Sequence, residues 1–218
     1  GISDKVKSRL NKLGISPSRS LGQNFLDDTG IAERIVRAAD LSSDDTVLEI
    51  GPGLGVLTDE LVREAGKVVL IEKDPALVGY LEGRYEDYDC EIKEGDVLDM
   101  ELPDFDKVVS NLPFSISSPV TFKLLKEGFD LGVLTYQKEF AERMTAAVGE
   151  SGYSRLTVMV STYSTVQELF QIPKHKFFPP PKVDAAVLRL IPSEPSFKII
   201  DRKAFDEVVR ILFNYRRK

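Results

Sequence analysis

The chain has 218 residues, of which 42% are apolar and 29% charged, and its formal net charge is −6, a composition typical of a soluble globule with a sizeable core. There is no apolar run near the twenty residues of a membrane span and no signal-peptide pattern, so we expect a cytoplasmic protein with no membrane partner. The single Cys90 excludes an internal disulfide, and the single His175, which we expect to be solvated, gives no support to a metal site.

The net charge hides a gradient along the chain. Residues 40–104 carry 19 acids against 5 Lys or Arg, net −14, whereas residues 1–37 carry 7 basic residues against 4 acidic ones, net +3. Residues 174–189 are at net +3 and residues 202–218 at net +4. Basic segments at both termini that gather on one face would meet the phosphates of a nucleic acid. Ordinary solvated charge is the alternative interpretation.

The first forty residues predict two helices and a loop between them. Residues 3–13 and 31–41 each have apolar residues at helical spacing. Between them, SLGQNFLDD (20–28) places polar Gln23 and Asn24 among apolar neighbours. This loop either is clamped to the core by Leu21, Phe25 and Leu26 or closes its two amides over a ligand.

From residue 46 onward, strand-like and helix-like runs alternate. This rhythm predicts an α/β fold with a mostly parallel sheet and helices on both faces. The expected strands are 47–50, 68–72, 90–96, 107–111 and 131–136, and the expected helices are 56–65, one that follows Pro75, and 118–127.

The loop after the first of these strands is rich in glycine. Gly51, Gly53 and Gly55 alternate within TVLEIGPGLG (46–55), so the backbone can reverse closely beneath a ligand. A nicotinamide-binding loop would need a glycine at position 56, which is Val56. The Gly-x-Gly-x-Gly spacing, preceded by the acid Glu49, instead resembles the S-adenosylmethionine (AdoMet) loop of Rossmann-like methyltransferases.

Polar residues follow the carboxyl ends of successive predicted strands. Gly51, Glu72, Asp96 and Asn111 all lie at this edge, where open α/β sheets bind ligands. Glu72 is placed to accept hydrogen bonds from ribose hydroxyls, and Asp96 from the exocyclic amine of an adenine. The pattern predicts a binding site for an adenosine moiety.

The tetrapeptide Asn111-Leu112-Pro113-Phe114 predicts the chemical centre. The Asn111 oxygen and the Leu112 carbonyl can accept hydrogen bonds from an aromatic amine and favour a tetrahedral nitrogen, whose lone pair is no longer delocalised into the ring. Pro113 biases the preceding residue toward extended geometry, which would aim that carbonyl. Phe114 can stack on an extruded base. The alternative is a strand-ending turn beside a core phenylalanine.

Eight ordered motifs span nearly the whole chain and carry a resemblance to one family. They are SLGQNFL (20–26), EIGPGLG (49–55), Glu72, GDVLD (95–99), NLPFSISSP (111–119), QKEFAERM (137–144), YSRLTV (153–158) and FFPPPKVDAAV (177–187). The chain thus resembles the KsgA/Dim1 family of small-subunit rRNA adenine dimethyltransferases, and its ISSP ending resembles the archaeal and eukaryotic branch. The resemblance implies a class I AdoMet-dependent methyltransferase with a seven-stranded sheet. It also implies conversion of two adjacent adenines near the 3′ end of small-subunit rRNA to N6,N6-dimethyladenine.

The resemblance also implies roles for individual residues. Phe114 and Phe177 would stack on opposite faces of the target base, and Phe178 would be packing. Asn111 to Phe114 would be the catalytic residues, with Asn111 facing both cofactor and target amine. The implied cofactor-binding residues are Gln23, Asn24, Leu26, Gly51, Gly53, Glu72, Asp96, Val97 and Asn111.

Two features depart from the family pattern. The tetrapeptide ends in Phe114 where tyrosine is more usual, so stacking is kept and any hydrogen bond from the hydroxyl is lost. The run at 205–218 resembles the start of a small helical lobe that is then cut short. We therefore expect a helical and cofactor-lid segment at 1–40, a catalytic domain at 41–195 and the start of a lobe at 196–218, in a monomer.

Three other functions stay open at this point. The first is a methyltransferase for a large-subunit rRNA adenine, of the antibiotic-resistance type. The second is a DNA adenine methyltransferase, disfavoured because those usually carry Asp or Asn, then two prolines and an aromatic residue. The third is an assembly factor that binds rRNA without turnover.

Overall fold

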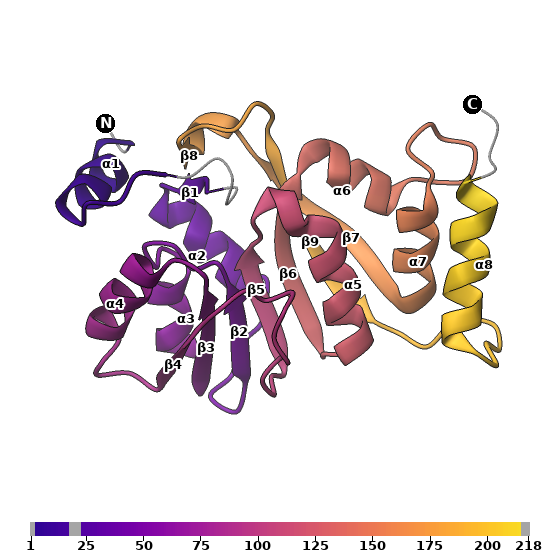
Figure 1. Ribbon diagram of the computed structural model, residues 1–218, viewed down its shortest axis with the longest axis horizontal. Helices are drawn as coiled ribbons and strands as arrows, with labels where there is room; N and C mark the ends of the chain where they lie inside the picture. The colour runs from indigo at the N-terminus through magenta and orange to yellow at the C-terminus, as the bar shows by residue number, and fades with distance from the viewer. Residues whose placement is uncertain (1–2, 18–22, 215–218) are drawn as a thin grey trace.

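The protein, described by a computed structural model for residues 3–17 and 23–214, is built around one seven-stranded sheet (Figure 1). The strand order is β4-β3-β2-β5-β6-β9-β7. The strands are β2 Thr46–Ile50, β3 Lys67–Glu72, β4 Cys90–Glu94, β5 Lys107–Asn111, β6 Leu131–Gln137, β7 Ser164–Ile172 and β9 Ala185–Pro192.

The five strands from β4 to β6 are parallel, and β9 pairs antiparallel with both β6 and β7. The chain starts at β2, adds β3 and β4 on one side, and then returns to add β5 and β6 on the other. The point between β2 and β5 is therefore the topological switch point, where open sheets of this kind bind ligands at the carboxyl edge.

Helices cover both faces of this sheet. Helices α2, α3 and α4 pack on one face, and α5, α6 and α7 pack on the other. Parallel strands buried on both sides need apolar residues at nearly every position, as in the VVLI run of β3, residues 68–71. The helices are α1 Ser3–Lys12, α2 Thr29–Arg37, α3 Thr58–Glu64, α4 Pro75–Arg84, α5 Ser117–Glu127, α6 Lys138–Thr145, α7 Arg155–Tyr163 and α8 Arg202–Asn214, with 3₁₀ turns η1 Phe114–Ile116 and η2 Lys174–Lys176.

A second, two-stranded sheet joins distant parts of the chain. Strand β1 (Phe25–Leu26) pairs antiparallel with β8 (Phe177–Phe178). The Lys176 ammonium lies 2.8 Å from Asp28 Oδ2, and the Lys176 carbonyl accepts from the Asp27 N–H at 2.8 Å. The segment before α2 is thereby fixed beside the proline-rich loop that follows β8.

The fold confirms the predicted α/β class, the mostly parallel sheet and the helices on both faces. Element ends differ by a few residues. Helix α2 ends at Arg37 rather than at residue 41, since Asp40 adopts a left-handed φ of 47°. Strand β4 ends at Glu94 rather than at 96, because Gly95 turns the chain and donates its N–H to the Glu72 carbonyl at 2.9 Å.

The charged segments are separated in space. Helices α1 and α8 lie at opposite ends of the long axis (Figure 1), so the basic residues of these two helices are not neighbours. Helix α1 lies beside β8 instead, close to the basic turn η2. His175 in η2 is exposed, as expected. The predicted contact of Leu21 and the basic residues 215–218 lie outside the described residues.

No helix among residues 3–17 and 23–214 is long and apolar enough to cross a membrane.

Candidate active site at the carboxyl edge of the sheet

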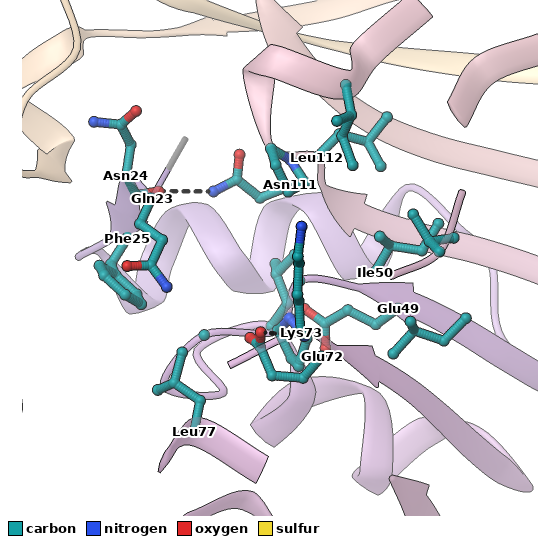
Figure 2. A pocket seen from close by; sticks show the side chains of 18 of the residues that line it. Gln23, Asn24, Phe25, Glu49, Ile50, Glu72, Lys73, Leu77, Asn111 and Leu112 are labelled. Carbon is teal, nitrogen blue, oxygen red and sulfur yellow. Dashed lines mark hydrogen bonds between the residues drawn. The ribbon is translucent and has the colours of Figure 1, made fainter. Parts of the chain in front are cut away.

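A pocket opens where β2, β3, β4 and β5 end, at the switch point of the sheet (Figure 2). The structure brings together here nearly all of the residues that the sequence singled out. Those that line the pocket are Gln23, Asn24, Leu26, Gly51, Gly53, Glu72, Asp96, Val97, Asn111, Leu112, Pro113 and Phe114. Phe177 does not line it.

The glycine loop forms one wall of the pocket by bringing bare backbone close to other segments. Gly51 and Gly53 have φ values of 65° and 60°, which side-chain-bearing residues rarely adopt. A Cβ on Gly53 would lie 2.8 Å from the Phe25 ring, and one on Gly51 would lie 3.3 Å from Pro113. The loop is therefore a cradle that a side chain would fill.

Glu49, at the base of this loop, is a functional candidate that the sequence marked only as part of the motif. It is 2% exposed and lines the pocket, and the Thr58 hydroxyl donates a hydrogen bond to its Oε1. Burial, with a smaller contribution from the nearby acids Asp59 and Glu72, raises the pKa of its carboxyl from 4.5 to about 8, although the Thr58 hydrogen bond opposes the rise. Glu49 is thus largely protonated at neutral pH.

We expect Glu49→Gln to remove a pH dependence of stability. A carboxyl whose folded-state pKa is raised stabilises the fold fully below its unfolded value of 4.5, and this contribution is lost as the pH rises toward about 8. Glutamine mimics the protonated acid, so the variant should match the wild type near pH 4.5 and exceed it increasingly up to pH 8. Urea unfolding across this range measures the difference, and two parallel curves would contradict the assignment.

Glu72 closes the second strand with its carboxylate already oriented. Its Oε2 accepts the backbone N–H groups of Lys73 at 2.7 Å and Asp74 at 3.0 Å (Figure 2). The side chain is buried, and this burial raises its pKa, while the backbone donors oppose the rise. The backbone thus fixes the acid at the pocket wall without using a second side chain.

Asp96 stands two residues beyond β4 and is charged. Its Oδ1 accepts the Leu98 N–H at 3.0 Å, and its Oδ2 lies 3.1 Å from the Lys73 ammonium. These hydrogen bonds, led by that of Leu98, lower the pKa of the Asp96 carboxyl. Lys123 of α5 donates to the Val97 carbonyl at 2.7 Å and so holds the next residue of the wall in place.

Asn111, at the end of β5, presents a buried acceptor to the pocket. Its Nδ2 donates to the Asn24 carbonyl at 3.3 Å (Figure 2), which leaves Oδ1 as the outward-facing group. Among the described residues, this buried Oδ1 has no hydrogen-bond partner. Because a buried polar atom without a partner costs about 1–3 kcal/mol, its persistence in a pocket points to a ligand that supplies the donor.

The Asn24 side chain ties this arrangement to the proline-rich loop. Its Nδ2 donates to the Pro179 carbonyl at 2.7 Å, while its backbone carbonyl receives Asn111. The Asn24 amide is therefore held by the proline-rich loop, and closure of the two amides over a ligand stays a prediction. Phe25 and Leu26 are buried in the core, and Gln23 and Asn24 line the pocket.

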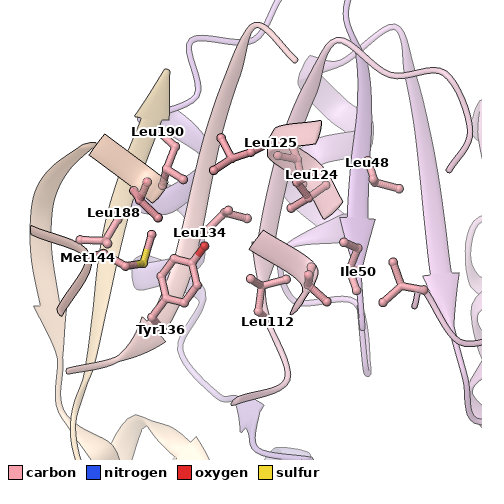
Figure 3. Close-up of a cluster of buried hydrophobic side chains, with 14 of the residues drawn as sticks. Leu48, Ile50, Leu112, Leu124, Leu125, Leu134, Tyr136, Met144, Leu188 and Leu190 are labelled. Atoms are coloured by element: carbon pink, nitrogen blue, oxygen red, sulfur yellow. The ribbon is translucent and has the colours of Figure 1, made fainter. Parts of the chain in front are cut away.

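The other residues of the tetrapeptide 111–114 are supported by the hydrophobic core on one face of the sheet. Leu112 is 1% exposed and packs with Leu134 and Tyr136 beneath the site (Figure 3). Pro113, with φ −55° and ψ 121°, leads into η1, where Phe114 is half-buried at the pocket wall. A rigid core thus carries the backbone that presents these groups.

The two predicted stacking rings are neighbours, but they do not face each other. The centroids of Phe114 and Phe177 lie 6.2 Å apart with an interplanar angle of 68°, an edge-to-face contact. Phe177 is 2% exposed, because β8 pairs it with Leu26 and packs it into the core. A base sandwiched between the rings would require Phe177 to turn, so this role stays a prediction.

Nothing in the sequence indicated that several of the pocket residues would line the site, apart from their position next to a motif. Lys73 directly follows the predicted ribose acid, and Leu77 comes from the helix after it. Phe25, Leu57 and Ile71 are apolar residues of elements already predicted. In the described part of the chain, no group of three or more His, Cys, Asp or Glu residues could hold a metal ion.

The sheet order, the glycine cradle and the polar residues at the strand ends together define a Rossmann-like methyltransferase. The sequence model described as ribosomal RNA adenine dimethylase matches residues 16–218. The chain belongs to this family, which confirms the resemblance seen in the eight motifs.

Known relatives agree with this assignment. A protein of Thermococcus onnurineus (strain NA1), named probable ribosomal RNA small subunit methyltransferase A, is 49% identical over 98% of this chain and 78% of its own length. A crystal structure of a dimethyladenosine transferase from Plasmodium falciparum superposes with a TM-score of 0.81 at 42% identity, covering 89% of this chain and 72% of that one. The 23S rRNA methyltransferase ErmE superposes at 0.76 with 32% identity, covering 88% and 79%.

Proposed function

We propose that the protein transfers methyl groups from AdoMet to N6 of two adjacent adenines near the 3′ end of small-subunit rRNA, giving N6,N6-dimethyladenine during ribosome biogenesis. Membership of the adenine dimethylase family supports the reaction. The archaeal relative named for the small subunit supports the choice of substrate. The observation that carries the proposal is the buried, unpartnered Oδ1 of Asn111 in the pocket, as far as the described residues go.

The pocket residues fit the cofactor. The glycine cradle leaves room that a Cβ would fill, and the oriented Glu72 carboxylate suits two ribose hydroxyls. Asp96 and Val97 would hold the adenine, while Gln23, Asn24 and Leu26 would line the methionine side. When bound, AdoMet supplies an electrophilic methyl group on a sulfonium sulfur.

The chain's own groups would prepare the target amine. Asn111 Oδ1 and the Leu112 carbonyl would each accept one hydrogen of the adenine N6, so that the nitrogen becomes tetrahedral and its lone pair, no longer delocalised into the ring, becomes nucleophilic. Phe114 would stack on the extruded base, a contact worth about 1–3 kcal/mol. No strong base is required, since the nitrogen becomes acidic only as the methyl group is added. The remaining rate acceleration would come from alignment of the amine nitrogen with the methyl group of AdoMet.

The large-subunit alternative keeps one supporting observation. The 23S rRNA methyltransferase ErmE shares the fold at 32% identity, which is lower than the 49% of the small-subunit relative. A non-catalytic assembly factor would not need an acceptor kept unpaired in a pocket. The domain limits at residues 40 and 195, the monomeric state and the cytoplasmic location stay predictions.

The deciding experiment offers labelled AdoMet with unmethylated small ribosomal subunits, and with large subunits and duplex DNA in parallel. We expect N6,N6-dimethyladenine in the small subunit alone. Label in the large subunit would establish the alternative substrate. Cofactor binding without transfer to any substrate would overturn the catalytic proposal in favour of the assembly factor.

A further inference from the structure

Lys73 contributes two different groups to the pocket, its backbone N–H and its side-chain ammonium. Its backbone N–H donates to Glu72 Oε2 at 2.7 Å and helps to orient the proposed ribose acid. Its ammonium reaches Asp96 Oδ2 at 3.1 Å and so contacts the proposed adenine acid. Figure 2 shows the side chain extended within the pocket, with its nitrogen directed away from Glu72. One residue therefore contacts both of the acids that would hold an adenosine.

Both oxygens of Asp96 have partners within the described chain. Oδ1 accepts the Leu98 N–H at 3.0 Å, and this bond belongs to the local turn. Oδ2 is paired with Lys73, so an amine that approaches this oxygen has to share it with the ammonium. The Lys73 side chain is 57% exposed, so its ammonium can move into water at little cost.

We propose that the Lys73 ammonium competes with the cofactor's adenine amine for Asp96 and thereby speeds release of the spent cofactor, S-adenosylhomocysteine. This inference rests on the proposed function, because it takes Asp96 as the adenine acceptor. Dimethylation of two adenines needs four methyl transfers, and each one requires the spent cofactor to leave before the next can start. Because AdoMet carries the same adenine, a competitor already within the pocket shortens the residence of both forms of the cofactor.

The test is the affinity of S-adenosylhomocysteine for Lys73→Met, measured by calorimetry and by stopped-flow dissociation. Methionine keeps the apolar stem and removes only the ammonium. Since exposed ion pairs are worth about 0.2–1 kcal/mol, we expect the variant to bind about 1.4- to fivefold more tightly through slower dissociation. The gain should shrink at high salt, because salt screens the pair in the wild type.

Two controls separate this effect from a general loss of charge. Lys93→Met removes a lysine of β4 that lies 3.5 Å from Glu91 and does not line the pocket, so its affinity should equal that of the wild type. In an Asp96→Asn background, Lys73→Met should no longer tighten binding, because the competition needs both charges.

The outcomes are distinct. Unchanged or weaker binding by Lys73→Met, with the wild type binding normally, would overturn the role of Lys73 and leave the proposed function intact. Failure of the wild type to bind S-adenosylhomocysteine at all would instead overturn the proposed function.

Discussion

Asn111→Ala is expected to lower the rate of methyl transfer by about a hundredfold to a thousandfold, the usual effect of removing one preorganised polar group from an active site. The Asn111 Oδ1 is the buried acceptor of the pocket that has no partner among the described residues. Under the proposed mechanism, its loss would leave one hydrogen of the target amine without an acceptor. The measurement is single-turnover transfer of labelled methyl groups to small subunits at saturating AdoMet.

The same variant should keep its stability, and this distinguishes a catalytic role from a structural one. Substitution removes the 3.3 Å bond to the Asn24 carbonyl, but it also removes a buried oxygen that has no partner in the described part of the chain, and the two effects oppose each other. The melting temperature should therefore change by only a few degrees. Asn11→Ala, on the exposed side of α1, is the matched control and should change neither quantity. Transfer by Asn111→Ala within threefold of wild type would contradict the mechanism.

The sequence predicted the parallel half of the fold well, for a physical reason. Strands buried on both faces must be continuously apolar, as residues 68–71 are, and each is followed by a polar group at the ligand edge. The same logic located Glu72, Asp96 and Asn111, because the carboxyl ends of parallel strands meet at one edge. The local sequence pattern was therefore sufficient to locate pocket residues that directly follow a parallel strand.

The parts that the sequence did not predict depend on contacts between distant segments. The pairing of β1 with β8 joins Leu26 to Phe177, and two-residue strands leave no periodicity to detect. This pairing buries Phe177 and turns its ring edge-on to Phe114. The Lys73–Asp96 contact likewise joins residues 23 positions apart, and a lysine after a strand is ordinarily a solvated charge.

The high pKa of Glu49 and the buried Asn111 oxygen, which has no partner among the described residues, share one origin. Both are polar groups held in a closely packed pocket wall, and each would be better solvated in the unfolded chain. A fold selected only for stability would not retain either of them. Their cost is offset by the apolar core beneath the site, which packs Leu112, Leu134 and Tyr136 without exposure to water (Figure 3).

Gly55→Ala should be the most destabilising small substitution in the glycine loop, lowering the free energy of unfolding by about 2–5 kcal/mol. Gly55 has φ 88°, which costs an alanine about 1–2 kcal/mol. Its Cβ would lie 1.9 Å from the Tyr85 hydroxyl, which donates to the Gly55 carbonyl at 3.0 Å or to Asp59 Oδ1 at 2.8 Å. Tyr85 is 2% exposed, so its displaced hydroxyl would be left buried without these partners, at about 1–3 kcal/mol.

Urea unfolding measures the loss, and helix α4 provides the matched control. A Cβ on Gly79, at the exposed side of α4, would meet no other segment of the described chain within 4 Å, so Gly79→Ala should raise stability by about 0.5–1 kcal/mol. The two variants add the same methyl group, and only the backbone conformation and the neighbour of that group differ. If Gly55→Ala unfolded at the urea concentration of the wild type, the loop would have to relax away from Tyr85. The conformation of the glycine loop would then not depend on the close contact between the Gly55 backbone and the Tyr85 side chain.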